Sequence, residues 1–265
     1  MKLMILGLLM GLVVFIRAQV KTEVPAVIPD AKPVAVEHIK VHGAALEGNL
    51  EGDDVDRDVI VFLPPSYKTR KNHRYPVLYA LHGYSIGAEQ WTHEIHVPQT
   101  IEGAFAQGAQ EIIVVLPDSK TVHNGSMYSS SATTGDFERF IAHDLVTYID
   151  VHYRTIARRT SRGLAGHSMG GYGATRISMK HPDIFGSVYI MSPCCLSARA
   201  AGPGNSAYEK ALEAVKTPAD SDKLPFGPRA QLASAAAWSP NPKNPPLYLD
   251  LPTKDGVVQA DVIAK

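Results

Sequence analysis

The segment whose residues are best suited to carry out a reaction runs from Gly163 to Ala174 and reads GLAGHSMGGYGA. Five of its residues, Gly166-His167-Ser168-Met169-Gly170, form the pattern G-x-S-x-G. In this pattern a serine hydroxyl is held on a sharp turn, where it can attack an electrophilic carbon. The glycines are small enough to let the two arms of such a turn approach closely. A glycine-rich turn without function has the same spacing, so the flanking elements must decide between the two.

The residues on either side of Ser168 predict a strand, a tight turn and a helix. SRGLAG precedes the serine as a short strand, and MGGYGATRISMKH follows as a helix that ends before Pro182. At a helix N-terminus the exposed N–H groups and the helix dipole favour negative charge. The backbone N–H of Met169 can therefore donate to a tetrahedral oxyanion.

A second oxyanion donor is expected in the loop after an earlier strand. The buried run YPVLYA is followed directly by LHGYS (81–85), in which Gly83 allows a sharp turn. The backbone N–H of Tyr84 is the candidate donor.

The rest of the chain predicts a sheet that could hold these loops. Ile39 to His42 and Val59 to Pro65 read as an antiparallel hairpin, joined through a turn at 51–56. Continuous apolar runs at 75–83, 111–119 and 185–193 indicate strands that are buried on both faces. A helix is expected after the N-cap Asp136, with one apolar face that comprises Phe137, Phe140, Ile141, Leu145, Tyr148, Ile149 and His152. Alternating strands and helices predict an α/β sandwich with an antiparallel edge.

The two ends of the chain differ from this core in amino-acid composition. Lys2, an apolar run over residues 3–16 and Ala18 predict a secretory signal peptide at 1–18, with an uncleaved membrane anchor as the alternative. Residues 19–36 read as a linker, and 37–265 as the domain. A segment rich in Ala, Pro, Gly and Ser (196–246) is a possible cap over a site, with a short helix at 207–215. The expected location is secreted or periplasmic.

Three segments in order carry a family resemblance: YPVLYALHGY…W (75–91), MYSSSATTGDFERFIAHDLVTYIDVHYRT (127–155) and GLAGHSMGGYGATRISMKHPDIFGSVYIMSP (163–193). They look like the esterase family of the α/β-hydrolase superfamily, which includes feruloyl and acetylxylan esterases, S-formylglutathione hydrolases and mycolyltransferases. The resemblance covers residues 37 to 195. It implies a three-layer sandwich, with Ser168 as the acylating nucleophile and Tyr84 and Met169 as the oxyanion donors. It implies no metal or organic cofactor, and it does not identify the ester.

The remaining catalytic groups are harder to place. In this fold the serine is followed by an acid and then by a histidine, yet the last of the eleven histidines is His181. The resemblance gives no base role to His82 or His167. Asp255, in the expected late strand and turn at 246–256, is the first candidate acid and Asp250 the second; the alternative is a residue beyond Lys265. The prediction is a chain truncated at its C-terminus, with strands missing, no working triad, an uncovered sheet edge and poor solubility.

Several other patterns receive a structural interpretation. DDVDRD (53–58) lacks the Gly and Glu that a calcium loop needs, so a solvated turn is expected. HEIH (93–96) is expected on a surface helix rather than at a metal. Cys194 and Cys195 are neighbours, and two buried thiols are favoured over a strained vicinal bridge. Their position in the family resemblance favours Trp91 and Tyr128 as lining residues of a substrate pocket, with a place in the core as the alternative.

The charge composition limits which classes of binding partner are expected. Lys and Arg together number 26, as do Asp and Glu, so no net charge attracts nucleic acid or an anionic membrane. The expected function is a serine carboxylic-ester hydrolase that acts on carbohydrate-linked acetyl or feruloyl esters. Two alternatives stay open, an acyltransferase to a sugar or lipid alcohol and a non-catalytic remnant. The expected partner is a small-molecule or polysaccharide ester, with no stable membrane partner; the oligomeric state stays open.

Overall fold

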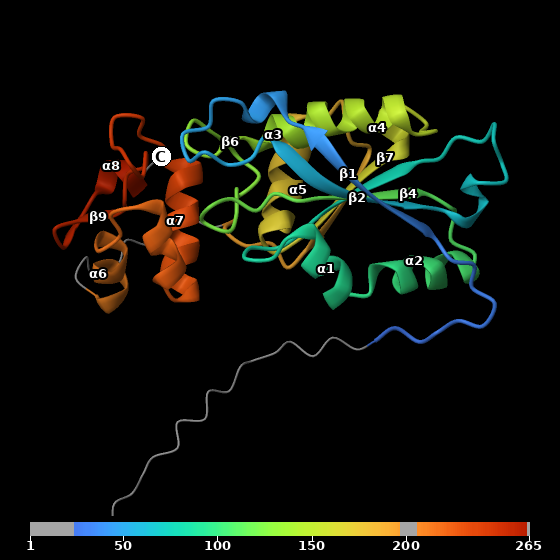
Figure 1. Ribbon diagram of the computed structural model, residues 1–265, viewed down its shortest axis with the longest axis horizontal. Coiled ribbons are helices and arrows are strands. Elements are labelled where there is room, and N and C mark those ends of the chain that lie inside the picture. The colour runs from blue at the N-terminus through green and yellow to red at the C-terminus, as the bar shows by residue number, and fades with distance from the viewer. Residues whose placement is uncertain (1–23, 197–205, 264–265) are drawn as a thin grey trace, which may run out of the picture.

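A six-stranded sheet organises the protein. The computed structural model describes residues 24–196 and 206–263, so the predicted signal peptide at 1–18 lies outside the described residues. The sheet has the strand order β1-β2-β4-β3-β7-β8 (Figure 1). Its strands are β1 (Ala35–His42), β2 (Asp56–Leu63), β3 (Val77–Leu81), β4 (Ile113–Pro117), β7 (Arg162–His167) and β8 (Ser187–Met191). The strand β2 is antiparallel to both of its neighbours, whereas β4, β3, β7 and β8 run parallel. The predicted antiparallel hairpin at the edge of a parallel sheet is confirmed.

Helices cover both faces of the sheet and give three layers (Figure 1). The helices α1 (Ala88–Glu94) and α2 (Val97–Ala106) pack on one face, where Trp91 meets Phe62. On the other face lie α3 (Phe137–Arg139), a π-helical segment (Phe140–Leu145), α4 (Val146–His152) and α5 (Met169–Lys180). Alternate side chains of β2 enter the two apolar clusters, which explains why a doubly covered strand is apolar throughout. The α/β sandwich predicted from the sequence is confirmed.

The helix predicted after Asp136 begins as expected and departs from the prediction at its end. The Asp136 carboxylate accepts a hydrogen bond from the Arg139 N–H at 2.9 Å. The predicted apolar face is buried over its first three turns, at Phe137, Phe140, Ile141, Leu145 and Ile149. Tyr148 is half-buried and His152 is exposed, so the prediction was wrong for His152. The helix ends there, and the imidazole stacks on Tyr148 at the surface.

The strand β8 differs most from its prediction. The run 185–193 predicts a strand that is buried on both faces, but Val188, Tyr189 and Ile190 are exposed. The reason is position: β8 pairs with β7 on one side and forms the edge of the sheet within the described residues. An apolar edge strand without charged side chains is prone to self-association.

The C-terminal part forms a small cap at one end of the sheet (Figure 1). It contains α6 (Ala207–Glu213), α7 (Phe226–Trp238), β9 (Thr253–Lys254), β10 (Val257–Val258) and α8 (Ala260–Ile263). The predicted helix at 207–215 is confirmed as α6, whereas α7 is not expected from the sequence. The late strand predicted at 246–256 is wrong, since only the two-residue strands β9 and β10 form near it. Pro246 and Pro252 each remove a backbone donor that a longer ladder would need.

Short elements complete the described chain. Two small strands, β5 (Ser130–Ser131) and β6 (Gly135–Asp136), pair with each other, and 3-10 turns lie at Ala44–Leu46, Pro65–Tyr67, Arg159–Ser161 and Pro218–Lys223. The described part of the predicted linker packs on α2, where the Val34 N–H donates to Glu102 at 2.9 Å. Within 24–196 and 206–263, no helix has both the length and the apolar content needed to cross a bilayer.

Candidate active site

Ser168 lies at the turn between β7 and α5, in the strand–turn–helix context that the sequence predicts. Its φ of 54° and ψ of −112° are strained for a residue with a side chain. Its N–H donates to the Met191 carbonyl at 3.0 Å, and its own carbonyl accepts from Tyr172 and Cys194 at 3.0 and 3.1 Å. These bonds hold the strained peptide in place. The side chain is half-buried, so the hydroxyl is not sealed in the core.

Two glycines make this turn possible by close approach. A Cβ on Gly166 would lie 2.0 Å from the carbonyl oxygen of Gly170, and a Cβ on Gly170 would lie 2.0 Å from that of Leu81. Both distances are far inside van der Waals contact. The G-x-S-x-G spacing therefore follows from packing the first turn of α5 against the ends of β7 and β3.

The structure brings the two predicted oxyanion residues to the serine. The loop after β3 passes Ser168 so closely that a Cβ on Gly83 would lie 3.6 Å from the serine Cβ. Gly125 packs against both Met169 and Tyr84, since a Cβ there would lie 2.7 Å from the sulfur of one and from the ring of the other. Met169 opens α5, so its N–H has no acceptor within the helix. Ser168, Tyr84 and Met169 therefore share one site.

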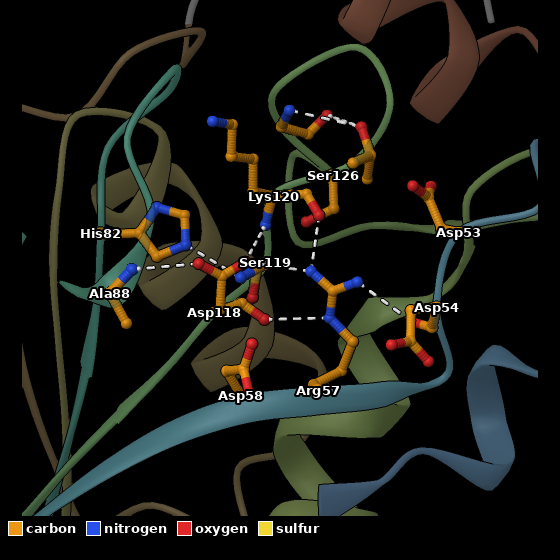
Figure 2. Close-up of polar contacts among 12 residues, drawn as sticks. Asp53, Asp54, Arg57, Asp58, His82, Ala88, Asp118, Ser119, Lys120 and Ser126 are labelled. Carbon is orange, nitrogen blue, oxygen red and sulfur yellow. Dashed lines mark hydrogen bonds and ion pairs between the residues drawn. The ribbon is translucent and has the colours of Figure 1, made fainter. Parts of the chain in front are cut away.

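A buried histidine fixes the loop that carries Tyr84. Figure 2 shows the His82 ring beside Ser119, whose N–H donates to its Nε2 at 2.8 Å. The other ring nitrogen, Nδ1, lies 2.8 Å from the Gly83 carbonyl and donates to it in the tautomer that these partners require. Burial lowers the pKa of His82, which keeps the ring neutral. Both nitrogens are thus engaged in holding the loop.

An ion pair anchors the neighbouring loop after β4. The Arg57 guanidinium donates from Nη2 to the Asp118 carboxylate at 3.0 Å and to the Lys120 carbonyl (Figure 2). The second carboxylate oxygen of Asp118 accepts from the Ala88 N–H at 3.1 Å. Both side chains are largely buried, so the pair links β2, the loop after β4 and the start of α1. The sequence interpretation missed this role. Arg57 lies two residues before the buried Val59 on the same strand, so both side chains point to the same face of the sheet.

Comparisons with known proteins show which family the chain belongs to. A family model with the description "Putative esterase" matches residues 54–257. The chain belongs to this esterase family.

Several relatives of the esterase-family chain are known. It is 31% identical over 138 residues to an endo-1,4-beta-xylanase/feruloyl esterase of Xylanibacter ruminicola, and this alignment covers 50% of the chain and 19% of the relative. It is 32% identical over 132 residues to the esterase Rv1288 of Mycobacterium tuberculosis, which covers 49% of the chain and 27% of the relative. A solved ferulic acid esterase is 33% identical with a TM-score of 0.53, over 61% of this chain and 60% of that one. A ferulic acid esterase of Anaeromyces mucronatus shares the fold at 22% identity and a TM-score of 0.52, over 71% and 65%. The chain thus spans less than two thirds of each of these relatives.

The esterase-family chain does not bring an acid and a base to Ser168 from the positions considered in the sequence. The His82 ring is engaged as described, and His167 is exposed at the end of β7. Asp250 and Asp255 line a hollow of about 950 Å³ in the cap, whose lining residues all lie within 210–262. Asp255 stands in the turn between β9 and β10, outside the six-stranded sheet.

The other sequence interpretations have mixed outcomes. Trp91 lies on α1 and packs into the apolar cluster beneath that helix, so its place at the site is wrong and the core alternative holds. Tyr128 is fully buried and donates to the His82 carbonyl at 3.1 Å, so it supports the loop after β3 rather than lining the site. The segment 53–58 is only partly a solvated turn, because the Arg57 side chain is buried. In the part of the chain that the structure describes, no group of three or more His, Cys, Asp or Glu side chains is arranged to hold a metal ion.

A second buried polar cluster lies behind the Tyr84 loop. The Glu51 and His123 side chains are 1% and 0% exposed, and Glu51 Oε1 lies 3.4 Å from His123 Nε2. Burial, with the carboxylate of Asp53 nearby, raises the pKa of Glu51 to about 9. Burial also lowers the pKa of His123 to about 4. Near neutral pH both groups are therefore uncharged, and their contact is not an ion pair. The His123 carbonyl accepts from the Tyr84 hydroxyl at 3.0 Å, so this cluster backs the oxyanion loop.

Replacing Glu51 with glutamine is expected to stabilise the protein more as pH rises. The folded state holds the Glu51 carboxyl neutral, whereas the unfolded state ionises it above about pH 4.5, so unfolding releases a proton. The contribution of the Glu51 carboxyl to the stability of the wild-type protein is therefore fully present below pH 4.5 and is lost as pH rises toward 9. The unfolding free energy of Glu51→Gln should therefore rise relative to that of the wild type between pH 5.5 and 8.5. The expected rise is at least about 1.4 kcal/mol, the value of one pKa unit.

Urea unfolding at pH 5.5, 7.0 and 8.5 measures this gap. The control is Glu47→Gln, since the Glu47 side chain is 63% exposed and should give a much smaller change. A gap for Glu51→Gln that stays constant with pH would contradict the assignment of a neutral buried carboxyl.

Proposed function

We propose that this chain carries the nucleophile and oxyanion site of a serine carboxylic-ester hydrolase. The observation that supports it is the strained Ser168 turn, with Met169 and Tyr84 packed together beside it. A strained, partly exposed serine at a helix N-terminus is the arrangement in which a hydroxyl faces backbone donors.

The proposed reaction proceeds through an acyl-enzyme. The Ser168 Oγ attacks the ester carbonyl carbon, a base takes the hydroxyl proton, and the carbonyl electron pair moves onto oxygen. The N–H groups of Met169 and Tyr84 donate to that oxyanion. Its collapse breaks the bond to the alcohol, which leaves with the proton from the base. Water then attacks the acyl-enzyme in the same way, releases the carboxylic acid and restores the serine.

The base and the acid complete the proposal from outside the described site. They are not placed among the described residues. In this fold they follow the serine along the chain in the order acid and then histidine. The alternative is a non-catalytic remnant.

The proposed substrate is a carbohydrate-linked acetyl or feruloyl ester, and the proposed location is outside the cytoplasm. The feruloyl esterases among the relatives support the substrate class. The apolar run after Lys2 supports export. An acyltransferase would use the same acyl-enzyme, and product analysis with and without an added sugar alcohol separates the two reactions.

A fluorophosphonate probe tests the nucleophile. The proteins are the 265-residue chain and its Ser168→Ala variant. We expect labelling of the chain at Ser168 and none of the Ser168→Ala variant, because the probe reacts with an activated serine hydroxyl.

Peptide mapping by mass spectrometry locates the label. Labelling of the chain at a residue other than Ser168, or no labelling of it at all, would refute the proposal.

A further inference from the structure

The cap helix α7 touches both sides of the candidate active site through aromatic rings. At its start the Phe226 ring lies 5.4 Å from the Tyr84 ring, at an interplanar angle of 78°. At its end the Trp238 ring lies 5.4 Å from Tyr172, whose N–H is bonded to the Ser168 carbonyl. The Trp238 indole also donates to the Ser129 hydroxyl at 3.0 Å. One helix is therefore docked to the oxyanion loop and to the first turn of α5.

The Phe226 end of this helix is held in position. With the Asn124 amide oriented so that its oxygen faces Arg229, that oxygen accepts from the guanidinium Nε and Nη1 at 2.8 Å. Arg229 is also paired with Asp222. The Tyr84 ring that Phe226 contacts is fixed by the bond from its hydroxyl to the His123 carbonyl. These contacts join the first turn of α7 to the loop behind Tyr84, so Phe226 has a defined place relative to the oxyanion site.

The Phe226 ring is nevertheless 66% exposed. It meets Tyr84 in a near-perpendicular contact that leaves most of its apolar surface open. A ring that only stabilised the cap would gain more by burial. An open ring beside an oxyanion donor instead offers apolar surface to a bound ligand.

The order of contacts suggests which part of a ligand reaches this ring. The Gly83 backbone lies beside Ser168, Tyr84 follows it in the chain, and Phe226 lies one ring further out. An acetyl group bound covalently at Ser168 is too short to extend past Gly83 and Tyr84. A cinnamoyl-type acyl group carries its aromatic ring several bonds from the carbonyl and is long enough to do so.

We propose that Phe226 is the specificity-determining contact for an aromatic acyl group, whose ring packs against it while the carbonyl lies at Ser168. This assignment rests on the proposed function for the position of the carbonyl. It makes the site selective for aryl-propenoyl over acetyl esters, since aromatic pairs gain stability beyond that of the apolar area that they bury.

Equilibrium binding of free ferulate to the full chain tests the inference, because binding needs no catalytic base. We expect Phe226→Ala to raise the ferulate Kd tenfold or more, and Phe226→Trp to keep it within threefold. The matched control is Tyr189→Ala, which removes a ring that is 67% exposed on β8 and should leave the Kd within twofold.

Titration by ligand-detected NMR measures these constants, and circular dichroism confirms that each variant is folded. An unchanged Kd in Phe226→Ala, an equal loss in Tyr189→Ala, or no ferulate binding by the wild-type chain would overturn the inference. Failure of the proposed function is a different result, namely absence of Ser168 labelling whether or not ferulate binds.

Discussion

Replacing Gly170 with alanine is expected to lower the unfolding free energy by about 3 kcal/mol and to abolish any reactivity of Ser168. The new methyl carbon would lie 2.0 Å from the Leu81 carbonyl oxygen and 2.8 Å from that of His82. Both are backbone atoms, so no side chain can rotate away. The first turn of α5 must therefore move off the end of β3, which separates Ser168 from the oxyanion loop.

Chemical denaturation of Gly170→Ala measures this loss, and Gly103→Ala is the matched control. Both glycines lie in helices, but a Cβ on Gly103 would make only an ordinary contact of 3.4 Å with Ile28. Since alanine is the better helix former, the control should be neutral or more stable by up to about 1 kcal/mol. Equal stabilities of the two variants would show that the close approach at Gly170 is not a constraint.

Replacing Arg57 with methionine is expected to destabilise the protein by about 3–5 kcal/mol, because it leaves the largely buried Asp118 carboxylate without its cation. The guanidinium also donates to the carbonyls of Asp54 and Lys120, which lose these partners at the same time. The loop after β4 should loosen, and with it the Ser119 N–H that fixes the His82 ring.

The control for this prediction is Lys40→Met on the neighbouring strand. Lys40 pairs with Asp58 at the same distance of 3.0 Å, but both side chains are more than half exposed. Removing a surface pair of this kind is expected to change stability little. Urea unfolding of the two variants should therefore separate them clearly, and similar losses would contradict the role given to burial.

The sequence by itself was sufficient for the parts of the site that are local in the chain. The turn at Ser168 depends on glycines two residues away on each side, and its strand and helix are continuous with it. The N-cap at Asp136 and the apolar periodicity after it likewise involve neighbours within a few residues. Such features are encoded by spacing, because backbone geometry fixes which neighbours meet.

The supporting contacts could not be predicted in the same way. Arg57 meets Asp118 across 61 positions, and Trp238 meets Ser129 across 109. The sequence interpretation placed Arg57 in a solvated turn at 53–58, since that segment does not fit a calcium loop. Its burial depends on a partner carboxylate that only the sheet order brings near.

What the sequence determined is thus the strand, turn and helix around Ser168, the alternation of strands and helices, and the family. The tertiary structure decided which faces are covered, and so placed Trp91 in the core, β8 at an open edge and Phe226 beside Tyr84. The physical reason is that periodicity reports whether a side chain suits an interior, whereas burial depends on which distant segment packs against it.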